Sequence, residues 1–214
     1  MSLIASVLQL DRQAVKALKI TDPYSLHRAV YSLYADVRDE AQKSASQASG
    51  ILYADQGGDS RGRRVLLLAN RPPAERLNDQ YGQVQSKPIA ASFLDHLDYR
   101  FKVIVNPTRR DSASRKLVPV KGREAIAAWF RERAVSSWGF EVDTPSLQVD
   151  RVEVLRFNAQ QGHAVTIAQA QVQGRLRVTD PEKFKTSFTQ GIGRARAFGC
   201  GLLQIVPLID NPFA

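Results

Sequence analysis

A chain of 214 residues with 43% hydrophobic and 24% charged residues has the composition of a soluble globular protein and suffices for one domain or two small ones. Its single cysteine, Cys200, excludes an internal disulfide and a zinc site built from cysteines. The first ten residues carry no basic region and only a short apolar stretch, so we expect neither a signal peptide nor a membrane span, and a cytoplasmic location.

Positive charge is clustered along the chain. The net charge is +9, from 30 Lys and Arg against 21 Asp and Glu. Residues 99–123 hold eight Lys or Arg and one acidic residue, and residues 183–201 hold four basic residues and no acidic one. Such clusters indicate a polyanionic partner. They do not form an amphipathic basic helix, so the pattern favours nucleic acid over a membrane surface.

The first elements are a strand and a helix. Residues 2–10 are apolar and end at Asp11, which predicts a strand. A helix is predicted to begin near Asp22, a good N-cap residue, with Pro23 in its first turn. Apolar residues then recur as in a core-facing stripe: Leu26, Val30, Leu33 and Val37. A second stripe carries aromatic rings and a histidine: Tyr24, His27, Tyr31 and Tyr34. The helix should therefore present an aromatic, polar face beside its core face.

The remainder of the first half predicts a small sheet. Residues 41–50 have few apolar side chains and indicate a connector. Strands are predicted at 50–54 and 63–69, separated by a turn at 56–60. Residues 71–79 follow as a short helix opened by two prolines. The order β-α-β-β-α is most of a ferredoxin-like unit.

From about residue 95 the order of elements begins again. A strand at 99–105 precedes a basic loop at 106–116, a strand at 117–120 and a helix at 122–138. Strands at 147–157 and 163–178 come next, and the second alternates apolar with polar residues. A helix beginning at Asp180 and Pro181, a glycine-rich loop and a strand at 202–206 complete the chain. We predict an α+β protein of two tandem ferredoxin-like (RRM-like) βαββαβ halves with antiparallel sheets, residues 1–94 and 95–214.

The glycine-rich loop before the last strand allows two interpretations. Four glycines fall within eleven residues: Gly191, Gly193, Gly199 and Gly201. Two arginines, Arg194 and Arg196, stand between them. The loop is either a helix C-cap with a turn, or a site where backbone N–H groups and arginines meet phosphates.

His27 is the leading candidate for catalysis. In RNA cleavage the substrate's own 2′-OH can be the nucleophile, so the protein needs to position the RNA and transfer a proton, which suits histidine at neutral pH. The alternative is a half-buried structural histidine. His96 and His163 have no second ligand at metal spacing, and the acidic residues are scattered, so we predict no metal site and no cofactor.

The loop at 106–116 is the best candidate for contact with an RNA backbone. It carries Arg109, Arg110, Arg115 and Lys116 around a turn-rich tip. The alternative is a solvated run of charge. The predicted strands carry no paired aromatic run of the kind that single-strand RNA-recognition modules use, which favours a stem read by shape and phosphates.

Three stretches resemble one family. The pattern G-I-G-x-x-x-x-G-x-G-L-L is similar to the glycine-rich loop of the CRISPR repeat-associated RNA-binding superfamily. The segment Asp22–Arg28 resembles the helix start that carries the catalytic histidine in CasE-type endoribonucleases, with a tyrosine three residues before it. The strand ending at Asn106 and Pro107, the basic loop and Trp129 also match that branch. The resemblance is weak in residues 41–95.

This resemblance implies a metal-independent endoribonuclease that cuts CRISPR precursor RNA at the 3′ base of the repeat hairpin and leaves a 2′,3′-cyclic phosphate. It implies that His27 is the general acid or base and that Tyr24 orients it or contacts the phosphate. It further implies that the mature RNA is retained within a multi-subunit effector complex. A non-catalytic RNA-binding or scaffold subunit of such a complex is the main alternative. A ribosome- or transfer-RNA-associated protein, suggested by charge alone, would not explain the glycine loop.

Overall fold

The structure, a computed structural model, describes residues 3–37, 49–60, 62–159 and 162–208. The chain divides into two compact units. The first comprises Met1–Ile89, Phe157–Ala164 and Ala197–Gly199. The second comprises Ala90–Arg156, Val165–Arg196 and Cys200–Ala214. Two short segments of the C-terminal half are thus part of the first unit.

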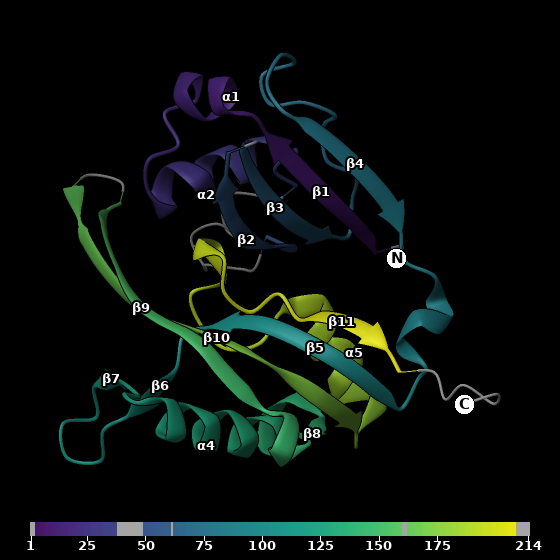
Figure 1. The fold of residues 1–214 in the computed structure, drawn as a ribbon, viewed down its shortest axis with the longest axis vertical. Helices are drawn as coiled ribbons and strands as arrows, with labels where there is room; N and C mark the ends of the chain where they lie inside the picture. The colour runs from purple at the N-terminus through teal and green to yellow at the C-terminus, as the bar shows by residue number, and fades with distance from the viewer. Residues whose placement is uncertain (1–2, 38–48, 61, 160–161, 209–214) are drawn as a thin grey trace. The chain divides into compact units, whose positions relative to one another are not determined.

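The first unit is built on an antiparallel sheet of strand order β2-β3-β1-β4 (Figure 1). Its strands are β1 (Ile4–Leu10), β2 (Ile51–Asp59), β3 (Gly62–Ala69) and β4 (Gln83–Pro88). This is the strand order of a ferredoxin-like sheet, with the third strand between the first and second. Two helices follow β1, namely α1 (Arg12–Ala17) and α2 (Pro23–Ser32).

Helix α2 begins where the sequence predicts. The Asp22 carboxylate accepts a hydrogen bond from the Ser25 backbone N–H (2.7 Å), and the Ser25 hydroxyl oxygen accepts one from the Asp22 N–H (3.0 Å). Pro23 occupies the first helical turn, where its missing N–H has no intrahelical partner to lose. Leu26 and Val30 are buried against the sheet. This orientation leaves the face that carries His27 half-buried.

Several expectations for the first unit are wrong. Residues 71–79 form no helix; the chain turns back there through the positive φ angles of Asn78 (50°) and Asp79 (57°). Leu77 is buried there instead. The described strand β4 and helix α1 were not predicted. Residues 41–48 of the expected connector lie outside the described residues.

The two stripes on α2 end sooner than predicted. The helix stops at Ser32, so residues beyond it do not continue its faces. Val37 is 66% exposed rather than in the core. Tyr34 is buried in the core, with Arg71 over its ring, rather than on the polar face. Burial raises the pKa of Tyr34 to about 12.

The second unit repeats the sheet order as β11-β5-β10-β8, with β9 pairing β10 (Figure 1). Its long strands are β5 (Asp98–Val105), β9 (Gln148–Asn158) and β10 (Ala164–Val178). Its short strands are β6 (Thr108–Arg110), β7 (Leu117–Pro119), β8 (Phe140–Val142) and β11 (Gln204–Pro207). Its helices are α4 (Arg123–Arg133) and α5 (Pro181–Gln190).

Aromatic side chains form the core of the second unit. Phe101 on β5 stacks on Phe130 of α4, with ring centroids 5.5 Å apart, and Phe140 meets Phe184 of α5 edge-on at 6.1 Å. These rings are fully buried. Burying several large rings contributes much of the hydrophobic stabilisation of a small domain.

The alternation predicted along β10 is largely confirmed. Ala170, Val172, Leu176 and Val178 are buried and Arg175 and Arg177 are exposed, whereas Ala168 is only half-buried. Gln169 departs from the pattern, since it is buried and its Nε2 donates to the Cys200 sulfur at 3.3 Å. Burial raises the pKa of the Cys200 thiol to about 12, so little of the reactive thiolate forms at neutral pH.

Three further expectations need correction. The loop predicted at 106–116 is a β-hairpin, because β6 pairs with β7. The helix predicted to reach residue 138 is an α-helix only as far as Arg133, and Ala134–Trp138 after it form a π-helical turn. Strand β8 follows it and was not predicted. The fold class itself, antiparallel ferredoxin-like sheets with helices, is confirmed.

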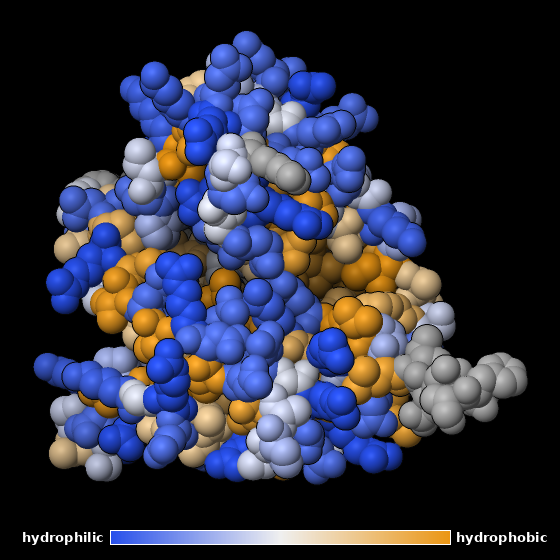
Figure 2. All heavy atoms as spheres, viewed as in Figure 1, coloured by the Kyte–Doolittle hydropathy of each residue, from blue (hydrophilic) through white to orange (hydrophobic). Residues whose placement is uncertain are grey.

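The surface is mainly polar. Hydrophilic residues cover much of the face shown in Figure 2, and hydrophobic ones reach that face between them. Among the exposed large hydrophobic side chains are Val154 on β9 and Val206 on β11, with 56% and 64% of their surface exposed. Within the described residues, no helix is both long and apolar enough to cross a membrane.

Two glycines of the loop should respond differently to substitution. A Cβ at Gly201, where φ is +87°, would overlap the carbonyl oxygen of Ile192, whereas a Cβ at Gly193 (φ +71°) would meet no described heavy atom within 4 Å. We expect Gly201→Ala to lower the free energy of unfolding by roughly 2–6 kcal/mol, from backbone strain and overpacking together. Gly193→Ala should cost about 1–2 kcal/mol, from the left-handed backbone alone. Urea denaturation of both variants measures this, and equal losses would contradict the packing.

Candidate functional site

His27 lies in the first unit, on the half-buried face of α2, against the segment Ala197–Gly199. Its Nδ1 is 2.7 Å from the carbonyl oxygen of Ala197. Because a carbonyl oxygen only accepts hydrogen bonds, Nδ1 must carry the hydrogen. In the neutral ring Nε2 is then left with a lone pair. The contact therefore fixes which nitrogen of His27 can take up a proton.

Three aromatic rings surround the imidazole. Tyr31, one turn further along α2, lies with its ring centroid 4.1 Å from that of His27. Phe198 of the glycine loop lies at 5.6 Å, and Tyr24, one turn earlier on α2, is stacked at 6.1 Å with 17° between the planes. Both candidate catalytic side chains, His27 and Tyr24, are thus in ring contact. The spacing of residues 24, 27 and 31 on one helix face produces this cluster.

Burial decides the charge of His27. It lowers the pKa of His27 below the ordinary value of 6.5, and the hydrogen bond to the Ala197 carbonyl opposes it with a smaller rise. The neutral imidazole is therefore the main form at neutral pH. A neutral histidine with Nε2 as its acceptor can act as a general base.

Tyr53 on β2 meets the same carbonyl. Its hydroxyl donates to the oxygen of Ala197 at 2.9 Å, so that oxygen accepts from both Tyr53 and His27. Gly199 packs on the Tyr53 ring, where a Cβ would lie 3.2 Å from the ring carbon Cε2. The φ angle of Gly199 is +81°, which side chains rarely adopt. The glycine loop thus brings a backbone oxygen to the histidine.

The four basic residues of the predicted loop are exposed on the β6–β7 hairpin of the second unit. Asp111 orders the hairpin tip, because its carboxylate accepts from the Ser114 N–H (2.8 Å) and hydroxyl (2.7 Å). Arg110 donates to the carbonyl of Arg115 at 2.9 Å. The Trp129 indole on α4 donates to the Thr108 carbonyl at 3.1 Å and fixes the base of the hairpin. An ordered hairpin, rather than a flexible loop, presents this charge.

The two arginines of the glycine loop differ. Arg196 donates to the carbonyl of Gln190, the last residue of α5, at 2.6 Å, which satisfies a backbone group at the helix end. Arg194 is exposed. The four glycines of the loop all have positive φ, from 71° to 87°: Gly191, Gly193, Gly199 and Gly201. Gly199 belongs to the first unit and the other three to the second.

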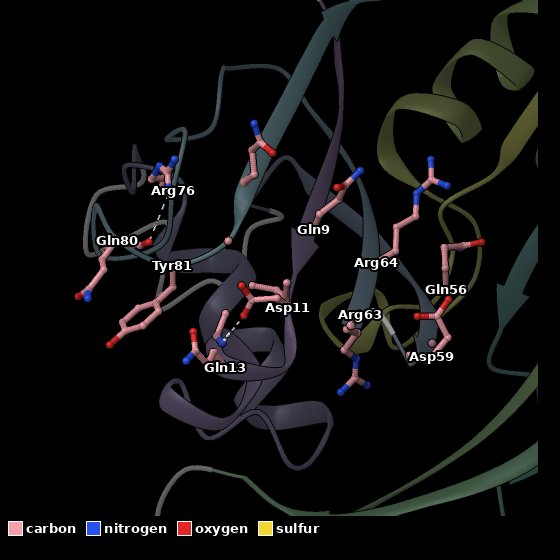
Figure 3. Close-up of a pocket in the computed structure, with 17 residues that line it drawn as sticks. Gln9, Asp11, Gln13, Gln56, Asp59, Arg63, Arg64, Arg76, Gln80 and Tyr81 are labelled. Carbon is pink, nitrogen blue, oxygen red and sulfur yellow. Dashed lines mark hydrogen bonds between the residues drawn. The ribbon is translucent and has the colours of Figure 1, made fainter.

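A separate hollow of about 860 Å³ lies in the first unit, between the ends of β1, the β2–β3 hairpin and residues 76–83 (Figure 3). Two of its polar side chains, Asp11 and Arg63, bind other groups of the first unit. Asp11 caps α1 through the Ala14 N–H (2.7 Å), and Arg63 is paired with Asp55. Figure 3 shows Arg63 and Arg64 pointing in different directions. The hollow therefore offers no convergent set of groups, and His27 does not line it.

The other two histidines, His96 and His163, do not belong to the cluster around His27. His96 and His163 are exposed, and His96 meets the Tyr99 ring edge-on at 6.1 Å. In the part of the chain that the structure describes, no three His, Cys, Asp or Glu residues are grouped so that they could hold a metal ion.

Three members of the site could not be identified from sequence patterns. Tyr53 looks like an ordinary strand aromatic, Ala197 contributes only a backbone oxygen, and Phe198 lies within a glycine-rich loop. The density of glycines around Phe198 was the one signal present, because it indicates a backbone that approaches another part of the chain closely.

Known proteins resemble this chain along most of its length. A family model for CRISPR associated protein matches residues 3–207. The CRISPR-associated endoribonuclease Cse3 of Thermus thermophilus is 24% identical over 200 residues, 88% of this chain and 92% of that protein.

Solved structures show the same fold. CRISPR endoribonuclease Cse3 bound to 19-nt RNA superposes with a TM-score of 0.80 and 23% identity, covering 97% of this chain and 100% of that one. A chain of the CRISPR RNA-guided surveillance complex, pre-nicking, gives a TM-score of 0.70 and 22% identity, with coverage of 97% and 100%.

Proposed function

Because the chain belongs to the family of CRISPR associated proteins, we propose that it is an endoribonuclease that cleaves CRISPR precursor RNA at the 3′ base of the repeat hairpin. Its likeness to an RNA-bound endoribonuclease supports this proposal. The observation that carries it is His27, a neutral, half-buried histidine whose Nδ1 is held by a backbone carbonyl.

In the proposed reaction Nε2 of His27 accepts the proton of the ribose 2′-OH. The 2′-oxygen attacks the adjacent phosphorus, and the bond from phosphorus to the 5′-oxygen of the next nucleotide breaks. The products are a 2′,3′-cyclic phosphate and a 5′-OH, which takes up a proton. Tyr24, in ring contact with His27, is suited to orient it or to contact the scissile phosphate. We assign no metal or cofactor to this reaction, because the nucleophile comes from the RNA.

Binding is assigned to the second unit's exposed cations. We expect the β6–β7 hairpin to contact phosphates of the RNA stem, since stems are recognised mainly by shape and phosphates. In the glycine loop Arg194 is the better candidate for an RNA contact, because Arg196 already binds the Gln190 carbonyl. The glycines would let the loop backbone approach the RNA.

We further propose that the protein keeps its mature RNA and assembles with other subunits of a CRISPR effector complex in the cytoplasm. Its likeness to a chain of a surveillance complex supports this. If His27 were only structural, the chain would be a non-catalytic RNA-binding or scaffold subunit of the same complex. A cleavage assay distinguishes the two.

Wild-type protein should cut cognate repeat RNA in EDTA, and His27→Ala should lower the single-turnover rate by about 10²–10⁴-fold while leaving hairpin binding largely intact. The loss follows from removing the proton acceptor. The control is His96→Ala, an exposed histidine of the second unit, which should cut at the wild-type rate. Near-wild-type cleavage by His27→Ala would refute His27 as the base, wild-type protein that binds the hairpin without cutting it would favour the non-catalytic alternative, and cleavage abolished by EDTA would contradict metal independence.

The cleavage rate should depend on pH in one direction. The neutral form of His27 is the active one and burial lowers its pKa, so protonation removes the base only below the ordinary value of 6.5. Under subsaturating RNA the rate should be constant around neutral pH and then fall by about tenfold per pH unit on the acid side. A midpoint above 6.5 would contradict the lowered pKa, and a rate that falls as the pH rises would show that the protonated histidine is the active form.

The hairpin charges should set the salt dependence of binding. In Arg109→Ala/Lys116→Ala, Arg110 keeps its bond to the Arg115 carbonyl, so the tip should stay ordered. Each phosphate that the variant no longer neutralises should reduce the slope of log K against log salt by about 0.7–0.9. RNA titrations over a salt series measure the slope. Lys87→Ala, an exposed lysine on β4, is the control. A double variant with the wild-type slope would identify the hairpin charge as merely solvated.

A further inference from the structure

The carbonyl oxygen of Ala197 has two donors that come from different parts of the sequence. His27 Nδ1 approaches it from α2 at 2.7 Å, and the Tyr53 hydroxyl approaches it from β2 at 2.9 Å. All three residues are in the first unit. The same oxygen that determines the state of the histidine is therefore held by a tyrosine of the sheet.

We propose that Tyr53 is a positioning residue for His27: it fixes the Ala197 carbonyl, and through that carbonyl it keeps the hydrogen on Nδ1 and the lone pair on Nε2. The proposal rests on His27 being the base of the proposed function. It adds that the glycine loop and the sheet together prepare the histidine before any RNA binds.

Tyr53 is well placed to restrain the carbonyl oxygen of Ala197. Only 1% of its surface is exposed, and β2, an edge strand of the antiparallel sheet, pairs it with Leu67 of β3. On the loop side, Gly199 lies flat against its ring, with no Cβ to push it away. Phe198, next to Gly199, packs against Phe157 with ring centroids 4.9 Å apart. A hydrogen bond from Tyr53 thus holds the Ala197 carbonyl. The two residues after Ala197 are held by packing, Phe198 on Phe157 and Gly199 on the Tyr53 ring.

The carbonyl needs such support because it belongs to a short, irregular segment. Arg196–Phe198 is a single 3-10 turn between residues with positive φ, Ala195 (58°) and Gly199 (81°). The tautomer of a neutral histidine is set by the hydrogen bond that its other nitrogen makes. If the carbonyl rotated away, Nε2 could carry the hydrogen instead, and the ring would lose its acceptor there.

The groups that face the imidazole leave few other ways to fix its tautomer. On α2 these are the rings of Tyr24 and Tyr31, and Tyr31 interacts through its hydroxyl with Ser49 at 3.1 Å. The loop contributes Ala197 and Phe198, which do not ionise, and β2 acts through Tyr53. Among the described residues, Ala197 is the hydrogen-bond partner of the His27 ring.

The test replaces Tyr53 by phenylalanine, which keeps the buried ring and removes only the hydroxyl. The tautomer of His27 is read in the free protein from the imidazole ¹⁵N chemical shifts, with His27→Ala to assign its signals. We expect wild type to show the Nδ1–H form and Tyr53→Phe to show an increased Nε2–H population. The single-turnover cleavage rate per folded molecule should fall by about 10-fold, at the lower end of what losing the supporting partner of a functional histidine costs.

Tyr99→Phe is a matched control. Tyr99 is also fully buried, and its hydroxyl also donates to a backbone carbonyl, that of Phe93 at 2.8 Å, but it lies in the second unit. Tyr53→Phe loses the bond to the Ala197 carbonyl, whereas Tyr99→Phe loses the bond to the Phe93 carbonyl and the one that Tyr99 accepts from the His96 N–H at 3.2 Å, so the control should be destabilised at least as much in urea denaturation. Only Tyr53→Phe should change the tautomer of His27 and the rate.

An unchanged tautomer ratio in Tyr53→Phe, or a rate loss no larger than that of Tyr99→Phe, would overturn the proposal. If Tyr53→Phe does not fold, the wild-type spectrum decides, since a dominant Nε2–H form of His27 contradicts the proposal by itself. The spectra need no RNA. A protein that keeps the Nδ1–H form through Tyr53 but does not cut RNA would therefore refute the proposed function and not the positioning role.

Discussion

The carbonyl oxygen of Ala197 is the point on which the candidate site depends. It can accept hydrogen bonds but cannot donate them, and it is shared by His27 and Tyr53. That asymmetry determines which imidazole nitrogen carries the hydrogen. A backbone oxygen can reach this position only if the chain around it is compact and turns sharply, which explains the glycines at 199 and 201. The glycine-rich loop therefore acts on the histidine through its backbone.

Burial and hydrogen bonding act on His27 in opposite directions. Burial lowers its pKa, while the carbonyl, by accepting from Nδ1, raises it by a smaller amount. The result is a neutral imidazole in a fixed tautomer, surrounded by Tyr24, Tyr31 and Phe198. The same helix that buries Leu26 in the core carries this ring on its neighbouring face. The packing of α2 in the first unit therefore also places His27 against the Ala197 carbonyl.

Residue type alone does not show which positive charges of the second unit are bonded within the protein. Arg196 binds the end of α5 and Arg110 binds the turn of the hairpin, so part of their role is structural. Arg194, Arg109 and Lys116 are exposed. Asp111, the one acidic residue in the basic stretch, orders the hairpin tip through Ser114.

The sequence by itself determined the elements whose signals are local. Asp22 and Pro23 start α2 and alternation defines β10, because each depends on neighbouring residues. His27 is a sequence prediction from its position and chemistry, and Tyr24 one from likeness to a family motif; their catalytic roles stay predictions. The helix expected at 71–79 is absent, because a turn at Asn78 and Asp79 prevails over a weak local pattern. Only the tertiary structure decided that Tyr53, Ala197 and His27 meet, since a contact between residues 144 or 170 positions apart has no local signature. The same holds for Arg196, whose role depends on where the end of α5 lies relative to the loop.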